Sequence, residues 1–448
     1  MQKNIELMEK APVKRAILSL ALPSVLAMMV QVIYGLTDTF FISQLNDPNL
    51  VAAVSLIMPF ALLIQAVGNI FAIGGASFIS RMLGEKNIME AKRTCSTAFY
   101  CSILMGMFVS AVAYVTKDNV LTLLGTSPAT WTPTETYMMI LVLSSSVQIL
   151  QIVLSGLIRS EGATKQAMLG IFIGTGANIV LDYIFILEWN WGIAGAAWAT
   201  AFGNLLGTIY YLIYFKKSKT LLSLGLSFFK PDKKMMTDIL SIGFPAALNA
   251  FIMGVSHIIS NNIAISYGEN VMAGNGIMMR LGAISFLTIM GIAQGYQPFA
   301  GYNFGAKHFG RLNASFIFST CLSTGIGLVM GIVFYFFGEG LLGLFMQNPD
   351  VIEKGFIMMR AFVWAMPLFG IHFMISMTFQ ATGKAELAFI LMLVRQFVFF
   401  LPLLFILNAL YGFNGFIYTQ PIVDAVTTVI AAGLLFVFLK RLPQKSCK

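Results

Sequence analysis

Two aspartates lie inside long apolar stretches of the sequence, where a charged side chain is costly. Asp38 occurs in LTDTFF and Asp182 in NIVLDY. A charge at the centre of a bilayer costs on the order of 3 kcal/mol or more, so such residues usually serve a function or are paired. Asp38 precedes Asp47 by nine residues, and Asp182 precedes Glu188 by six. This spacing predicts that the two carboxylates lie at a similar depth, in the outer half of the membrane.

Two further oxygen-bearing side chains can join these carboxylates. Asn178 lies four residues before Asp182 and so shares its helix face, and Thr200 adds a hydroxyl from the next apolar run. Together, Asp38, Asn178, Asp182 and Thr200 offer hard oxygen ligands for Na⁺, or a buried carboxylate pair that could carry H⁺. This set is the predicted cation-coupling site. The plainer alternative is that each aspartate caps a kink or bonds a neighbouring Ser or Thr.

A second polar set falls in the later part of the chain. Arg395 lies nine residues into its apolar run and Asp424 nine residues into the next, on helices that would be adjacent and antiparallel. A structural ion pair near the membrane midplane is the favoured interpretation, and a pH- or substrate-sensitive element is the alternative. His257 is the one candidate proton relay in its run, although such a histidine is more often a packing residue. His257, Arg395 and Asp424 form a candidate polar site in the second lobe.

Only membrane-spanning helices can position these residues. Of 448 residues, 58% are hydrophobic and 10% are charged, against about 25% charged in soluble domains. This composition excludes a soluble enzyme, a disordered chain and a coiled coil, and continuous runs exclude a β-barrel. We expect an all-α membrane protein that is not an enzyme, has no catalytic residues and binds no nucleic acid despite a net charge of +9. Twelve runs are long enough to span a bilayer: 16–44, 51–80, 94–115, 136–157, 166–187, 192–215, 237–266, 272–303, 313–337, 355–380, 387–407 and 415–439.

The distribution of Lys and Arg predicts the orientation. Of 28 such residues, three lie in the segments assigned to the outside (Lys117, Lys354 and Arg360), two lie within spans (Arg280 and Arg395), and 23 lie in inner segments. The positive-inside rule therefore places both termini in the cytoplasm of a multi-pass protein. No Cys/His cluster suggests a metal centre, so the four cysteines are expected to be free thiols: Cys95, Cys101, Cys321 and Cys447.

The sequence is an internal repeat with an almost constant offset of 220 to 222 residues. Four landmarks pair in this way: ILSLALPSVL (17–26) with ILSIGFPAAL (239–248), FISRMLGEK (78–86) with FAGYNFGAK (299–307), RSEGATKQA (159–167) with QATGKAELA (380–388), and WGIAGAAWAT (191–200) with YGFNGFIYTQ (411–420). The repeat predicts two six-helix bundles, 1–220 and 237–448, joined by a cytoplasmic linker, 221–236. Because six spans are even in number, a pseudo-two-fold axis along the membrane normal should relate the bundles.

Two similar bundles around a cavity can rock, which is the geometry of a secondary transporter with alternating access. No GxxxxGK[ST] motif occurs, so we expect an ion gradient, with no cofactor, to supply the energy. Channel selectivity-filter signatures are absent as well. The 27 Met and 39 Phe residues can build adaptable apolar walls for lipophilic substrates.

Taken together, the doubled landmarks resemble the MATE (multidrug and toxic compound extrusion) transporters, and most closely their bacterial MepA-like branch. The quoted segments are IYGLTDTFFI, GGASFISRMLGEKN, LIRSEGATK, ANIVLDYIFI and GIAGAAWAT. The resemblance implies twelve helices in two lobes, a bacterial cytoplasmic membrane location, and efflux of lipophilic, often cationic compounds by H⁺ or Na⁺ antiport, as in antibiotic resistance. It places the cation site on Asp38, Asn178, Asp182 and Thr200.

Some members of this family also use acidic residues in the seventh and tenth helices, and this chain has none buried there. Two alternatives remain open. A lipid-linked precursor flippase of the same superfamily would need a strongly cationic cavity, whereas only Arg280 and Arg395 lie within spans. A non-transporting receptor or scaffold would not need buried carboxylates. The partners expected are small lipophilic or cationic substrates and the lipid bilayer, with the protein acting as a monomer.

Overall fold

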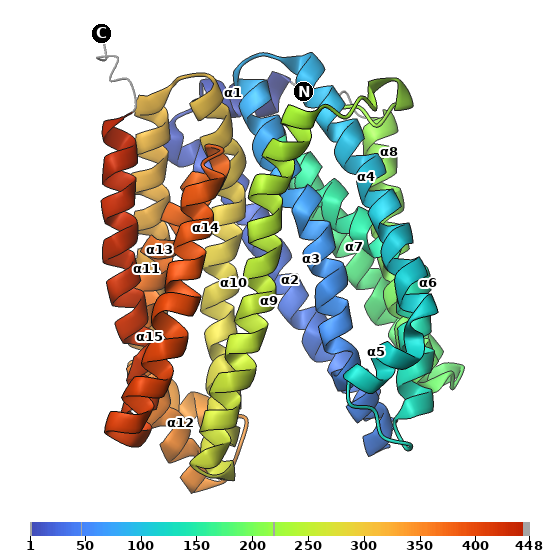
Figure 1. Ribbon diagram of the computed structural model, residues 1–448, viewed down its shortest axis with the longest axis vertical. Helices are drawn as coiled ribbons and strands as arrows, with labels where there is room; N and C mark the ends of the chain where they lie inside the picture. Colours follow the sequence, from blue (N-terminus) through green and yellow to red (C-terminus); the bar gives the residue numbers. More distant parts are fainter. Residues whose placement is uncertain (1, 46, 218–219, 442–448) are drawn as a thin grey trace. The chain divides into compact units, whose positions relative to one another are not determined.

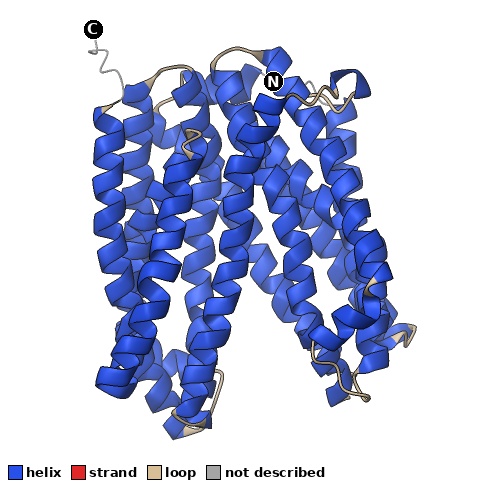
Figure 2. Ribbon diagram, viewed as in Figure 1, coloured by secondary structure: helices blue, strands red, loops and turns tan. Residues whose placement is uncertain are grey.

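The computed structural model describes residues 2–45, 47–217 and 220–441, and every regular element in these ranges is a helix (Figure 2). This confirms the predicted all-α fold. The elements are α1 Gln2–Glu9, α2 Val13–Ser43, α3 Pro48–Gly84, α4 Ile88–Val115, α5 Lys117–Leu123, α6 Trp131–Ser160, α7 Thr164–Asp182, η1 Tyr183–Glu188, α8 Gly192–Lys217, η2 Leu226–Phe228, α9 Lys233–Ser266, α10 Glu269–Gly305, α11 Phe309–Gly343, α12 Pro349–Phe362, α13 Ala365–Ala381, α14 Ala385–Leu393, η3 Val394–Phe400 and α15 Leu401–Lys440 (Figure 1).

Within the described ranges, nine continuous helical stretches are long and apolar enough to cross a membrane. One of them, Ala385–Lys440, has 56 residues, or roughly 84 Å of helix, about twice what a bilayer needs. It contains two spans that meet at Gly412, whose backbone is not helical (φ 56°, ψ −135°). The bent pair α12 and α13 supplies another span. With the 26-residue α8, which is long enough but less apolar because of its Gly, Thr and Asn residues, the twelve expected spans are accounted for.

The bend between α12 and α13 has a local cause. The two helices meet at 46°, and Pro367 lies in the first turn of α13. Proline has no backbone N–H, so it cannot bond to the carbonyl of Val363 as a continuing helix would require. The chain therefore restarts its helix at Ala365, where the missing donor would be unsatisfied in any case.

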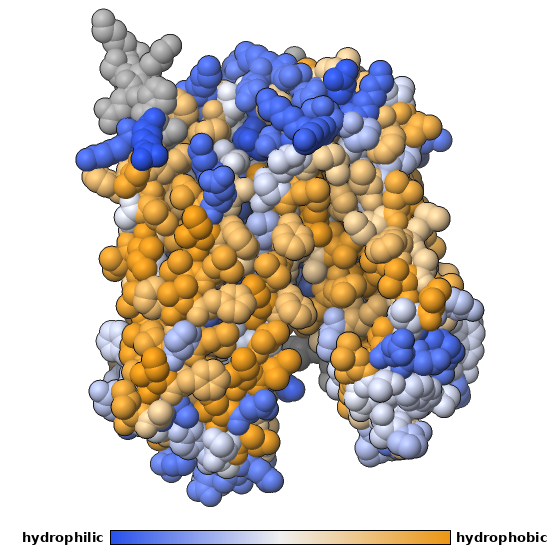
Figure 3. Space-filling model, viewed as in Figure 1, coloured by the Kyte–Doolittle hydropathy of each residue, from blue (hydrophilic) through white to orange (hydrophobic). Residues whose placement is uncertain are grey.

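The exposed faces of the helices are mostly apolar along their middle parts, and polar residues gather at the helix ends (Figure 3). Leu143, Phe336 and Val429 are among the large apolar side chains that are exposed. In water such a surface would drive aggregation, but in a bilayer it faces lipid. Of the four cysteines, Cys95, Cys101 and Cys321 are free thiols, and Cys447 lies outside the described residues.

The internal repeat is visible in the backbone as well as in the sequence. Residues with positive φ, a conformation that most residues avoid, recur at the repeat offset. The pairs are Lys86 (60°) with Lys307 (58°), Gly162 (80°) with Gly383 (77°), and Gly192 (57°) with Gly412 (56°). Because two of these residues are lysines, the shared geometry reflects equivalent turns after α3 and α10 and not merely the freedom of glycine.

The contacts divide the chain into two compact units, and the division differs from the predicted lobe boundaries. The first unit is residues 1–11 and 26–248, and the second is residues 12–25 and 249–448. The start of α9 therefore belongs with the first unit. Gly74 of α3 lies against the backbone of Ile239, and Gly243 of α9 lies against the backbone of Ile70. A Cβ at either glycine would collide with main-chain atoms, so these helices approach as closely as backbones allow.

The second unit contains an equivalent close contact between two helices. The start of α2 lies against α10, where Gly295 meets the backbone of Ala21 and Gly291 that of Val25. A Cβ at Gly291 would come within 2.6 Å of the Cα of Val25, well inside van der Waals contact. Sequence periodicity could not show this exchange, because the segments are apolar in either arrangement.

The linker after α8 is bound to the first unit along part of its length. Glu161, in the turn after α6, accepts hydrogen bonds from the Tyr214 hydroxyl (2.5 Å), the Thr220 hydroxyl (2.7 Å) and the Leu221 amide (3.2 Å). Burial raises the pKa of the Glu161 carboxyl, and these three donors partly offset the rise. Ser96 of α4 also donates to the carbonyl of Gly225. Residues 220–225 are thus held in place by specific hydrogen bonds.

The predicted orientation can be tested by cysteine labelling in intact cells. In a variant without native cysteines, Asn49→Cys and Gly268→Cys should react with an impermeant thiol reagent added outside, because both positions are exposed at the ends assigned to the outside. Lys230→Cys, exposed in the linker, should react only after the cells are opened. Labelling of the Lys230→Cys protein in sealed cells would reverse the assigned topology.

Candidate functional site

The first unit brings the four predicted cation-coupling residues into one connected group. Asn178 of α7 donates from Nδ2 to the Thr200 hydroxyl of α8 (3.4 Å). Asp182 lies one helical turn beyond Asn178, and both are buried. Asp38, half-buried on α2, interacts electrostatically with Asp182. Side chains from α2, α7 and α8 therefore form one polar cluster inside an otherwise apolar bundle.

Unpaired oxygen atoms distinguish this group from a structural network. Both carboxylate oxygens of Asp182, one of Asp38 and the amide oxygen of Asn178 are buried with no hydrogen-bond partner. Asp182 has no exposed surface at all. Buried polar atoms are normally satisfied, and a buried bare carboxylate is especially costly. An arrangement of four unpaired acceptors fits a bound cation or a proton.

The alternative that each aspartate caps a kink or bonds a neighbouring hydroxyl finds no support at Asp182, because neither of its oxygens has a donor. Asp182 ends α7, and the next six residues form a π-helical turn, η1. Such turns are rare and frequently occur at functional sites. In the described part of the chain, no group of three or more His, Cys, Asp or Glu residues is arranged so that it could hold a metal ion. A cation site here must therefore use two carboxylates with neutral oxygens.

Two tyrosines that were not predicted from the sequence also lie near Asp38, Asp182 and Thr200. The Tyr34 hydroxyl lies 3.3 Å from the Thr200 hydroxyl, and Tyr34 and Tyr137 both interact electrostatically with Asp38 and Asp182. Tyr34 could have been found, because it lies four residues before Asp38 on the same helix face. Tyr137 lies on α6 and has no such signal in the sequence.

The second unit pairs Arg395 with Asp424, as the sequence predicted. Arg395 Nε donates to Asp424 Oδ1 (2.9 Å), and Gln420 Nε2 donates to Asp424 Oδ2 (2.9 Å). Both oxygens of this carboxylate are therefore satisfied, in contrast to Asp182. Arg395 lies in the π-helical segment η3 and its guanidinium also covers the Phe369 ring at 5.7 Å. Arg280, the other basic residue within a span, is exposed on α10.

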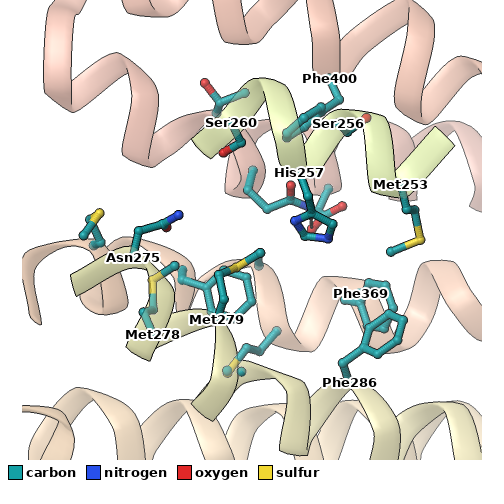
Figure 4. Close-up of a pocket in the computed structure, with 18 of the residues that line it drawn as sticks. Met253, Ser256, His257, Ser260, Asn275, Met278, Met279, Phe286, Phe369 and Phe400 are labelled. Atoms are coloured by element: carbon teal, nitrogen blue, oxygen red, sulfur yellow. Dashed lines mark hydrogen bonds between the residues drawn. The ribbon is translucent and has the colours of Figure 1, made fainter. Parts of the chain in front are cut away.

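The Arg395–Asp424 pair lies in the wall of a cavity of about 270 Å³. His257 projects from α9 into this cavity, towards the side where Met279, Phe286 and Phe369 lie (Figure 4). The structure thus places all three residues of the candidate second-lobe site, His257, Arg395 and Asp424, around one cavity. The Phe286 and Phe369 rings pack with their centroids 5.1 Å apart.

Several polar residues of this cavity were not identified from the sequence. Ser256 donates to Gln396 Oε1 (3.3 Å), and the buried Ser285 hydroxyl has no partner. Gln420 could have been found from its position four residues before Asp424. Ser285 is a single polar residue among apolar neighbours and Gln396 directly follows Arg395. Only the packing of separate helices shows that both line one space.

Comparisons with known proteins agree with the repeat and with the fold. The sequence model described as MatE matches residues 23–184 and again residues 245–406. The multidrug export protein MepA of Staphylococcus aureus (strain MSSA476) is 32% identical over 434 residues, covering 97% of this chain and 95% of the relative. The protein of the same name in Staphylococcus saprophyticus is 30% identical over 433 residues, with the same coverage.

Solved structures give the same result. A structure of MATE in complex with MaL6 superimposes with a TM-score of 0.93 at 24% identity, covering 98% of this chain and 99% of that one, which establishes the fold. An outward-facing multidrug resistance MATE family transporter of the MOP superfamily has a TM-score of 0.92 at 25% identity, covering 99% of both chains. The resemblance seen in the sequence motifs is confirmed. Because the family match occurs in both halves and spans most of the chain, the protein belongs to the MatE family.

Proposed function

We propose that the protein is a secondary active multidrug efflux transporter, which exports lipophilic, often cationic compounds in exchange for H⁺ or Na⁺. The observation that carries the proposal is Asp182, fully buried with two unpaired carboxylate oxygens in a chain whose relatives are named multidrug export proteins. A group that must be neutralised to remain buried is suited to binding and releasing a cation.

Antiport follows if substrate and coupling cation compete for the same carboxylates. A cationic compound would be attracted by Asp38 and Asp182, and no basic side chain interacts with either of them in the described part of the chain. Entry of H⁺ or Na⁺ from outside would remove that attraction and release the compound. Each ligand then lowers the affinity for the other by the same factor, because coupling is a reciprocal free energy.

The residues of the group have different parts in this scheme. Asp182 and Asp38 carry the charge that binds the cation. Asn178 contributes its free amide oxygen, while its Nδ2 holds Thr200 in place. Rocking of the lobes 1–220 and 237–448 would expose the group to each side in turn, as in transporters built from repeats. Both termini lie in the cytoplasm in this scheme, and the monomer is the transporting unit.

The flippase alternative is less compatible with the charges in the spans. A carrier for a pyrophosphate-linked lipid needs cationic side chains free to bind phosphate. Arg395 is already paired with Asp424, and Arg280 is exposed on α10. The buried, unpaired groups of the first unit are acidic.

An ion-exchange experiment in proteoliposomes tests the proposed function and identifies the coupling ion. Purified protein is reconstituted with ethidium, a lipophilic cation, and transport against its gradient is followed by fluorescence. Uphill ethidium movement should begin when an inward ΔpH or an inward Na⁺ gradient is imposed, and stop when that gradient is collapsed. Ethidium movement that is the same with and without either gradient would contradict antiport.

A further inference from the structure

The cavity of the second unit differs from the group in the first unit in one respect that decides what it can hold, namely charge. Its wall contains one guanidinium and one carboxylate, Arg395 and Asp424, joined at 2.9 Å. The side chains of this pair are 11% and 1% exposed. The first-unit group instead has two carboxylates and no basic partner in the described part of the chain. The two units therefore present sites of different net charge.

The remaining lining suits a small aromatic molecule. Met253, Met279, Phe286 and Phe369 form adaptable apolar walls (Figure 4). The volume of about 270 Å³ is slightly below that of typical small-molecule pockets, which begin at roughly 300 Å³, so the ligand must be small. Ser285, 3% exposed and without a hydrogen-bond partner, supplies a free polar group. An apolar cavity with a few convergent polar groups is typical of a ligand site.

Charge balance selects among the ligands that could use the ion pair. A cation that took Asp424 would leave Arg395 buried without a counter-ion, and an anion that took Arg395 would leave Asp424 in the same state. Breaking one side of a buried pair is strongly unfavourable. A zwitterion leaves neither charge unpaired, because its carboxylate can bind Arg395 while its ammonium binds Asp424. Gln420 already donates to the second oxygen of Asp424 and can hold it in position during the exchange.

We propose that this cavity is a second ligand site, specific for small zwitterionic aromatic compounds that carry a carboxylate and an ammonium group. The site is separate from the cation-coupling group of the first unit. Binding to it does not depend on the proposed antiport and can be measured without any ion gradient. A failure of this proposal would therefore leave the proposed function standing, and the reverse also holds.

Four indole compounds that share one ring and differ in charge test the proposal. Tryptophan is zwitterionic, tryptamine cationic, indole-3-propionate anionic and indole neutral. Tritiated forms are bound to the detergent-purified full chain and measured by scintillation proximity. Tryptophan should bind about tenfold or more tightly than each of the others, which is the effect of one additional charge-assisted hydrogen bond. Equal binding of tryptamine or indole, or no specific binding of tryptophan, would overturn the proposal.

Variants show whether the preference comes from the ion pair. The double variant Arg395→Gln, Asp424→Asn should bind tryptophan and indole with Kd values within about threefold of each other, because the charge-assisted bonds are gone. The matched control is Lys117→Gln, Glu135→Gln, which removes an ion pair outside the cavity and should keep the tryptophan preference. A preference that survives in the Arg395→Gln, Asp424→Asn protein would refute the assignment.

A cavity-filling variant covers the case in which the double variant does not fold. Ala283 lines the same cavity on α10, and Ala283→Phe should occupy its space while the ion pair remains intact. Tryptophan binding should fall to background in the folded Ala283→Phe protein. Unchanged binding would show that tryptophan binds elsewhere, and would overturn the proposal as well.

Discussion

Asp182→Asn is expected to abolish gradient-driven efflux while the protein still folds and reaches the membrane. Asparagine keeps the size of the side chain but cannot carry a proton or the full negative charge that holds Na⁺. Both Asp182 oxygens are buried and unpaired, so no hydrogen bond is lost. An unpaired buried carboxylate is costly to desolvate, and the neutral asparagine avoids most of that cost. The variant should therefore be inactive in the proteoliposome assay and at least as stable to heat in detergent as the native protein.

Neighbouring variants give this prediction its controls. Asp38→Asn should abolish or strongly weaken efflux, and Thr200→Ala should have a milder effect because it removes one neutral oxygen. The matched control is Glu188→Gln, six residues beyond Asp182, where the carboxylate is exposed and bonded to Tyr183. That variant should keep native efflux. If Asp182→Asn still drives efflux with the native dependence on ΔpH and ΔNa⁺, the coupling site lies elsewhere and the second unit becomes the place to look.

Substitutions that break the Arg395–Asp424 ion pair should cause the largest loss of stability among the variants proposed for this protein. Either Arg395→Gln or Asp424→Asn leaves one buried charge without its counter-ion, which typically costs about 3–5 kcal/mol. The double variant removes both charges and should recover much of that loss, so that the two substitutions are strongly non-additive. Thermal unfolding of the four proteins in detergent measures this cycle directly.

The partly exposed Lys117–Glu135 pair is the comparison for this cycle. Its side chains are 38% and 29% exposed, and the Glu135 carboxylate raises the pKa of Lys117. Because solvent screens such a pair, its single variants should unfold at nearly the native temperature. If both Arg395→Gln and Asp424→Asn unfold at the native temperature, the buried pair contributes nothing to stability.

Much of the architecture could be predicted because the bilayer constrains it. Continuous apolar runs can only be spanning helices. The internal repeat was read from the sequence, and the structure shows it again in the matching backbone conformations of Lys86 and Lys307. The Arg395–Asp424 pair was predictable because two opposite charges at equal depth on adjacent helices have few other partners. Asp38 and Asp182 were identified by the same argument from depth.

The rest depends on how helices pack, which periodicity does not encode. The π-helical turns at Tyr183–Glu188 and Val394–Phe400 lie in apolar runs that resemble the neighbouring spans. No local sequence signal therefore marks the extra residue in either turn. The cavity of the second unit combines residues from separate helices, including Ser285 and Gln396. Residues 16–25 are as apolar as the remainder of α2, and only the facing glycines Gly291 and Gly295 show which unit they join.

The exchanged helix starts have a consequence for the order in which the protein can be assembled during synthesis. Residues 233–248 complete the packing of α3, yet they leave the ribosome after all of α2–α8. Residues 12–25 are synthesised first, but they cannot complete their packing until Gly291 and Gly295 of α10 have been synthesised. Neither unit can close until the chain has been translated well into its second half, so a fragment ending at residue 220 should be a substrate for membrane proteases. Two half-chains expressed together should escape degradation only if residues 12–25 of the first half pack against the second half, and residues 233–248 of the second half pack against the first.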